Sequence, residues 1–118
     1  MVARIKAARQ ERVPVLVSAM TIIEADDHKI HPARAAYVLS RLQIVPVDAD
    51  MASHATRLLR AAGLHGHKYA IDAAVTALAL AQRGDATVLT SDVEDIEMLR
   101  DADDQELRSG RNLLVRKV

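Results

Sequence analysis

The sequence predicts an α/β fold built on a parallel sheet, and three observations support this prediction. Short apolar runs of strand length, such as residues 13–17 and 86–89, alternate along the chain with longer segments of helical periodicity. This alternation favours parallel strands with helices on both faces of the sheet. Residues 69–81 are apolar nearly all round, as in a central, buried helix. The chain has 118 residues, the length of a single domain, which we expect to span 1–118.

The first half of the chain is predicted to contain five elements. They are a helix over 2–12, a strand over 13–17, a helix that ends at Glu24, a helix over 32–41 and a strand over 43–47. Ser18 or Thr21 can cap the helix that leads to Glu24. Pro32 suits the first turn of a helix. Pro46 cannot donate a backbone hydrogen bond, so its strand belongs at the edge of the sheet.

The second half is predicted to contain five more elements. They are helices over 51–62, 69–81 and 93–99, and strands over 86–89 and 113–118. Asp48 and Asp50 precede the first of these helices as candidate capping residues, and Gly63 ends it. Residues 64–68 are expected to form a loop, and residues 101–111 a charged segment.

The composition excludes several classes of function. There is no Phe or Trp and there are only two Tyr, so stacking on nucleic-acid bases is not a main binding device. Sixteen basic and sixteen acidic residues cancel, which argues against the broad basic surface of a sequence-independent DNA binder. Without cysteine the chain forms neither disulfides nor thiolate metal sites. No apolar run approaches the roughly 20 residues of a membrane span, and no signal peptide is evident, so we expect a soluble, cytoplasmic protein.

Asp72 is the only charged residue in the apolar segment 69–81. A buried, unpaired carboxylate costs several kcal/mol, so Asp72 needs a cation, backbone donors or a metal ion as its partner. The simpler interpretation is an aspartate in the first turn of its helix, which the helix dipole favours by under about 1 kcal/mol.

Three further acids occupy comparable positions. Glu24 is the only charged residue over 13–25 and comes one turn into the helix that follows a strand. Asp92 and Asp95 follow the strand 86–89 at the start of the next helix. Each has an ordinary alternative: Glu24 as a solvated surface residue, and Asp92 with Asp95 as a capping box.

Together the four acids predict a metal site. Right-handed crossovers between parallel strands bring the segments that carry them to the same edge of the sheet. Carboxylates gathered around one crevice repel one another unless a divalent cation neutralises them. Ligation by oxygen alone suits Mg²⁺ or Mn²⁺, and such an ion generates a nucleophilic water for phosphodiester cleavage.

Polar residues beside these acids are candidate substrate contacts. Thr90 and Ser91 end the strand that leads to Asp92, and their hydroxyl groups are expected to add ligands or to orient a water molecule. Lys68 precedes the apolar helix, where it is expected to contact phosphate near a helix amino terminus. The alternative for Lys68 is a solvated residue of a polar loop.

The order of these motifs resembles the PIN domain, and in particular VapC-type toxins of bacterial toxin–antitoxin pairs. The resemblance rests on a solitary glutamate after VPVLVSA, on HGHKYAIDAAVTALA and on VLTSDVEDIEML, and it covers essentially the whole chain. It implies a PIN-like three-layer α/β/α sandwich, Mg²⁺- or Mn²⁺-dependent ribonuclease activity, and a small antitoxin protein that covers the site. By motif, Glu24, Asp72 and Asp92 match metal-site acids, and Asp95 matches a further acid found in many members.

The sequence departs from this family pattern at its amino terminus. PIN domains begin with a short apolar strand that ends in an Asp followed by Thr or Ser, whereas this sequence begins at the next helix. We therefore expect either an amino-terminally truncated domain or a natural start further upstream. In a truncated domain the strands at 13–17 and 86–89 must pair directly, or a second copy must fill the gap between them.

Two functions follow from this departure. The first is a metal-dependent endoribonuclease, expected as a homodimer, whose catalysis is impaired by the missing first Asp. The second is a catalytically silent PIN-like domain that binds or regulates a partner. A phosphoacceptor domain also gathers acids at strand ends, but the first strand here does not end in paired acids.

Overall fold

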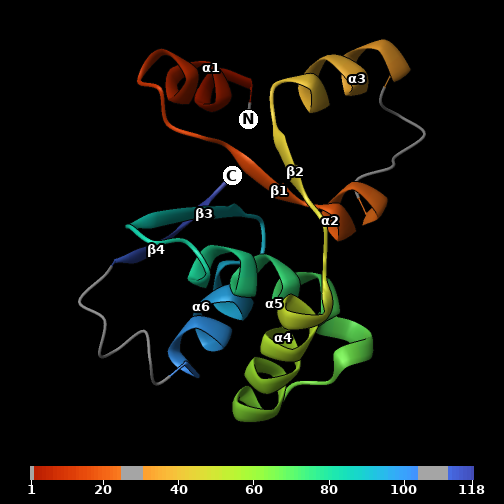
Figure 1. The fold of residues 1–118 in the computed structure, drawn as a ribbon, viewed down its shortest axis with the longest axis vertical. Coiled ribbons are helices and arrows are strands. Elements are labelled where there is room, and N and C mark those ends of the chain that lie inside the picture. Colours follow the sequence, from red (N-terminus) through yellow and green to blue (C-terminus); the bar gives the residue numbers. More distant parts are fainter. Residues whose placement is uncertain (1, 25–30, 104–111) are drawn as a thin grey trace. The chain divides into compact units, whose positions relative to one another are not determined.

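The structure is a computed structural model that describes residues 2–24, 31–103 and 112–118 (Figure 1). Along these residues one or two helices separate each strand from the next, which agrees with the predicted α/β fold. The chain divides into two compact units, Met1–Pro46 and Val47–Val118.

The first unit contains two short strands that pair in parallel. Its elements are α1 (Val2–Gln10), β1 (Leu16–Ser18), α2 (Ala19–Glu24), α3 (Pro32–Ser40) and β2 (Gln43–Val45). Leu16 lies opposite Gln43 in the ladder. The Ser18 hydroxyl accepts a hydrogen bond from the Met20 N–H at 3.2 Å, so Ser18 provides the predicted cap of α2. Residues 25–30, which connect α2 and α3, lie outside the described residues.

The strand predicted over 13–17 starts later than expected, at Leu16. Arg12 takes a left-handed φ of 58°, which ends the helical path after α1. The Val13 N–H then donates to the Ala8 carbonyl at 2.8 Å, so Val13 still belongs to the turn. Apolar residues alone do not reveal this boundary because Val13 is as suitable for a strand as Leu16.

The second unit contains the longer helices. Its elements are α4 (Ala49–Ala62), α5 (Gly66–Leu80), β3 (Ala86–Thr90), α6 (Val93–Asp101) and β4 (Leu113–Lys117). The Asp48 carboxylate accepts the Met51 N–H at 2.8 Å and caps α4, and Gly63 ends α4 with a left-handed φ of 69°. The Asp48 cap and the end at Gly63 confirm the prediction, but the helix begins at Ala49, two residues earlier than predicted, so Asp50 lies in its first turn and does not cap it.

Helix α5 begins at Gly66, three residues before its predicted start, so the loop expected over 64–68 is too long. The first turn consists of Gly66, His67 and Lys68, which carry no apolar side chain and therefore add nothing to the helical periodicity. This shift matters for Asp72, because it places that residue one turn deeper in the helix.

The strands pair in parallel, as predicted, but they form two ladders. In the described part of the chain β1 pairs with β2 and β3 pairs with β4. In the second ladder Ala86 lies opposite Leu113, and Thr90 lies opposite Lys117. No described strand joins the ladders, so neither a continuous sheet nor direct pairing of β1 with β3 is formed by these residues.

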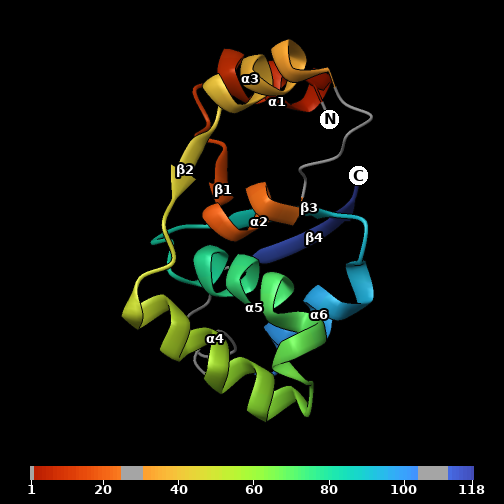
Figure 2. The ribbon, with the colours of Figure 1, turned by 90° about the vertical axis from the view of Figure 1, so that its right-hand side faces the viewer.

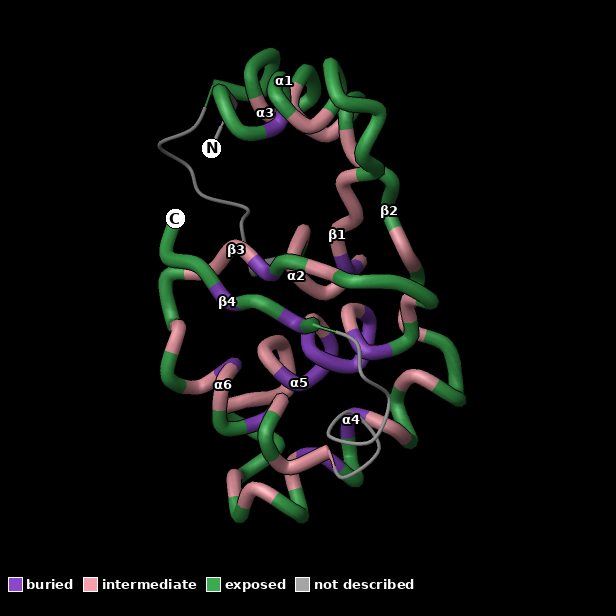
Figure 3. The backbone as a smooth tube through the Cα atoms, turned by 90° about the vertical axis from the view of Figure 1, so that its left-hand side faces the viewer, coloured by how far each residue is buried: buried purple, intermediate pink, exposed green. Residues whose placement is uncertain are grey.

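The buried core of the second unit lies between the β3–β4 ladder and its helices. Helices α5 and α6 lie against one face of the ladder, and α4 packs on α5 (Figure 2). Buried positions recur along α5 and alternate along β4 (Figure 3). The cluster consists of Ala55, Leu58, Ala73, Ala77, Leu80, Val88, Ile96, Leu99, Leu113 and Val115. Helix α5 is therefore the predicted central helix. None of the described helices is long and apolar enough to cross a membrane.

Candidate metal centre

Three of the four predicted acids come together in the second unit. Asp72, Asp92 and Asp95 each offer a carboxylate oxygen, and these three atoms all lie within 4.8 Å of one another. Asp72 comes from the second turn of α5, Asp92 from the turn after β3, and Asp95 from the first turn of α6. Two of these acids thus lie just after the end of β3, and the third is brought to them by α5.

The position of Asp72 rules out the helix dipole as its main stabilising partner. Helix α5 starts at Gly66 and has no acid in its first turn, so the first-turn position expected for Asp72 is wrong. The dipole's effect fades within that first turn. Asp72 is half-buried, and its backbone carbonyl accepts a hydrogen bond from the buried Thr76 hydroxyl at 2.8 Å. Its carboxylate is thus positioned by a well-packed part of the helix.

The capping-box alternative for Asp92 and Asp95 is also wrong. Asp92 occupies the N-cap position of α6, but its side chain makes no capping hydrogen bond. Its N–H donates to the Thr90 hydroxyl at 3.0 Å, and the capping box requires that N–H for the Asp95 side chain. The exposed carboxylate of Asp92 and the half-buried carboxylate of Asp95 are therefore left available for other ligands.

The three carboxylates fit a hard divalent cation. Mg²⁺ binds oxygen at about 2.0–2.1 Å, so two ligands on opposite sides of one ion stand about 4.2 Å apart. The observed limit of 4.8 Å exceeds this separation slightly, and a small side-chain rotation closes the difference. The group offers only oxygen donors, which suits Mg²⁺ or Mn²⁺ better than softer ions.

A hollow of about 330 Å³ lies beside two of these acids. It is lined by Ser91, Asp92, Val93, Glu94, Asp95 and Lys117. Ser91, a predicted substrate contact, thus lies next to Asp92 in this hollow. Lys117 was not predicted, although alternation along the last strand places residue 117 on the same side as Leu113 and Val115.

The remaining predicted residues are less closely connected with the cluster. Glu24 is the last residue of α2, in the other unit, and its side chain lies outside the described part of the structure. Lys68 is exposed in the first turn of α5, and its ammonium lies 5.2 Å from the centre of the Tyr69 ring, a cation–π distance. The Thr90 hydroxyl accepts the Asp92 N–H and so shapes the turn that presents Asp92.

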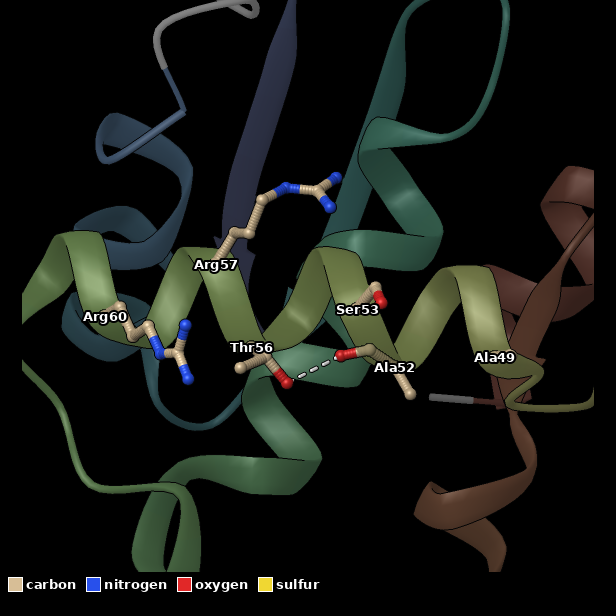
Figure 4. A pocket seen from close by; sticks show the side chains of 6 residues that line it. All are labelled: Ala49, Ala52, Ser53, Thr56, Arg57 and Arg60. Carbon is tan, nitrogen blue, oxygen red and sulfur yellow. Dashed lines mark hydrogen bonds between the residues drawn. The ribbon is translucent and has the colours of Figure 1, made fainter.

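A second hollow, of about 440 Å³, follows the exposed side of α4 (Figure 4). Its lining residues all belong to that helix, and the Thr56 hydroxyl donates to the Ala52 carbonyl at 2.8 Å. Arg57 and Arg60 extend toward different sides of the helix. The described residues that line this surface offer two hydroxyl groups and two guanidinium groups but no carboxylate.

Comparison with known proteins identifies the family. A family model described as PIN domain matches residues 5–102, a range that includes all four predicted acids. No curated protein and no solved structure matches the chain. PIN domains are typically metal-dependent nucleases, which agrees with a cluster of oxygen ligands in a parallel α/β fold. Because the match covers most of its length, the chain belongs to the PIN domain family.

Proposed function

We propose that the chain is a metal-dependent endoribonuclease, the VapC-type toxin of a toxin–antitoxin pair, that hydrolyses RNA phosphodiesters with Mg²⁺ or Mn²⁺. The observation that supports this proposal best is the approach of Asp72, Asp92 and Asp95 oxygens to within 4.8 Å in a member of the PIN family. Such a group of carboxylates is costly unless a cation offsets their repulsion.

The side chains of the cluster have distinct roles in this proposal. Asp72, Asp92 and Asp95 hold the ion, and Glu24 is a further ligand on the grounds of the sequence motif. A divalent ion held there would polarise a phosphoryl oxygen of the RNA and would activate a water molecule as the nucleophile. Ser91 lines the hollow beside Asp92, where its hydroxyl orients that water or a phosphate oxygen.

Thr90 and Lys68 have supporting roles in the proposal. The Thr90 hydroxyl holds the Asp92 N–H and thereby keeps the turn in the conformation that presents the carboxylate. Lys68, exposed at the start of α5, contacts a phosphate of the RNA away from the hollow.

We expect single-stranded RNA to be cleaved in the presence of millimolar Mg²⁺ or Mn²⁺ and to remain intact in EDTA. Because an ion that binds only the folded chain stabilises it by mass action, Mn²⁺ at about 100 times its dissociation constant should add about 2.7 kcal/mol to the free energy of unfolding. Gel-resolved cleavage and thermal unfolding with and without Mn²⁺ measure the two effects. Absence of both would favour the catalytically silent binding domain.

We also propose that the chain assembles as a homodimer in the cytoplasm and binds a small antitoxin. Several large apolar side chains of the first unit are exposed, most of all Ile23, which is 76% exposed. Val13, Tyr37 and Ile44 are about half exposed, and each described strand pairs on one edge only. Open edges and exposed apolar residues favour association with another chain.

The molar mass in solution tests the proposed homodimer directly. Light scattering coupled to size exclusion is expected to give twice the chain mass of 12.9 kDa, because a second copy covers the exposed apolar side chains of the first unit. Replacing Ile23 by Ser should shift the population toward the monomer, whereas Ser53→Ala on the exposed side of α4 should not. A stable monomer at high protein concentration would contradict the homodimer.

A further inference from the structure

Lys117 occupies the end of β4 next to the end of β3. In the parallel ladder it lies opposite Thr90, and the Val118 N–H donates to the Thr90 carbonyl at 3.0 Å. This hydrogen bond fixes the last residues of the chain beside the turn that presents Asp92. The backbone position of Lys117 is therefore determined by the same strand end that builds the candidate metal centre.

The side chain of Lys117 lies on the side of the ladder that faces the helices. Along β4, Leu113 and Val115 are buried in the core, whereas Leu114 and Arg116 are exposed on the opposite face. Alternation places Lys117 with the first pair. It is nevertheless exposed, because it stands beyond the packed core and lines the hollow beside Asp92 and Asp95.

Among the described residues that line this hollow, Lys117 is the one cation, and the lining also includes three acids: Asp92, Glu94 and Asp95. Within the described ranges, no carboxylate lies within 4.0 Å of its ammonium group. None of the described acids therefore forms an ion pair with Lys117. A lysine ammonium is a compact charge with three hydrogen-bond donors, and it remains able to bind an anion that enters the hollow.

We propose that Lys117 is a substrate-binding residue that contacts a backbone phosphate of the RNA as it lies across the acids. This inference rests on the proposed nuclease function and adds a residue that holds substrate rather than metal. The acids repel a phosphate wherever the ion does not offset their charge. The Lys117 ammonium attracts the phosphate and so favours its binding on the Lys117 side of the hollow.

The chain offers a matched control for this contact. Arg116 carries the same charge one residue earlier but lies on the opposite face of β4, with its guanidinium donating to the Val115 carbonyl at 3.4 Å. Replacing either residue by Gln removes one positive charge from the same strand. Only Lys117→Gln removes a charge from the hollow.

The test measures binding of fluorescein-labelled oligouridylate and oligoadenylate by anisotropy, in Ca²⁺ to keep the RNA intact and at several salt concentrations. We expect Lys117→Gln to weaken binding of both RNAs roughly fivefold and to lower the salt slope by about 0.7, as for one lost phosphate contact on a single strand. Arg116→Gln should bind like the unmodified chain, and Lys117→Arg should retain most of the affinity.

Calorimetric titration with Mn²⁺ alone distinguishes this role from metal binding, because Lys117→Gln removes a positive charge beside the acids and should bind Mn²⁺ no more weakly than the unmodified chain. Equal RNA affinities of Lys117→Gln and Arg116→Gln would overturn the proposal, and so would loss of Mn²⁺ binding in Lys117→Gln. In either case metal-dependent cleavage by the unmodified chain would leave the proposed nuclease function intact. Conversely, absence of cleavage with a fivefold binding defect would refute the nuclease and retain the phosphate contact.

Discussion

Asp72→Asn is expected to slow metal-dependent RNA cleavage by at least about a hundredfold, because a ligated ion supplies several kcal/mol of transition-state stabilisation and each 1.4 kcal/mol is a factor of ten. Asparagine has nearly the shape of aspartate, so α5 should pack as before, but the neutral amide is a poor ligand for a hard cation. Single-turnover cleavage of a labelled RNA at saturating protein measures the loss.

Asp50→Asn provides the control for Asp72→Asn. Asp50 is an exposed acid in the first turn of α4, in the same unit but outside the cluster, and its replacement should leave the cleavage rate within about twofold, as for most surface changes. Mn²⁺ titration should show a weakened site in Asp72→Asn alone. Undiminished cleavage by Asp72→Asn that still requires the metal would remove Asp72 from the ligand set.

The acids of the candidate site could be found from the sequence because they interrupt apolar patterns. Asp72 stands out in a segment with no other charge, and Asp92 follows a strand directly. The sequence could not decide between a cap and a ligand, since the same residue types occupy the same positions for both purposes. The structure argues against the capping box by two local details: the Asp92 side chain makes no capping hydrogen bond, and the Asp92 N–H donates to the Thr90 hydroxyl.

Lys117 could not be identified in this way. Its position in the hollow follows from the register that sets it opposite Thr90, and these residues are far apart in the sequence. The alternation of Leu113 and Val115 with exposed neighbours indicates only the side of the strand. Pairing partners are a non-local property, and a one-residue shift of register would place Lys117 on the opposite face.

The fold shows the same division between local and non-local information. Element order and parallel pairing follow from periodicity and alternation, and both ends of α4 follow from Asp48 and Gly63. The start of β1 and the start of α5 were misplaced because turn residues there carry no distinctive pattern. The separation of the strands into two ladders depends on which strands meet, and periodicity contains no such information.

Leu99→Ala is expected to lower the free energy of unfolding by about 2–5 kcal/mol, a large share of the stability of a small domain. The Leu99 side chain is 0% exposed, and Ile96, one turn earlier in α6, is 1% exposed. Removing the larger part of a fully buried side chain loses its transfer free energy and leaves a cavity between α6 and its neighbours. Urea unfolding measures the change as a lower midpoint with an unchanged slope.

Met98→Ala is the matched control, because Met98 precedes Leu99 in α6 but is 47% exposed, and its truncation should cost about 0.5 kcal/mol or less. Equal costs for the two variants would show that α6 is not anchored through Leu99.

The same helix carries Asp95 and is preceded by Asp92, so the stability of the Leu99→Ala variant also depends on any ion bound at the candidate metal centre. If these acids bind Mn²⁺ in the folded state alone, an excess of about 100 times the dissociation constant should restore about 2.7 kcal/mol to the variant. If Mn²⁺ raises the free energy of unfolding of neither the Leu99→Ala variant nor the unmodified chain, no ion is bound by the acids of α6.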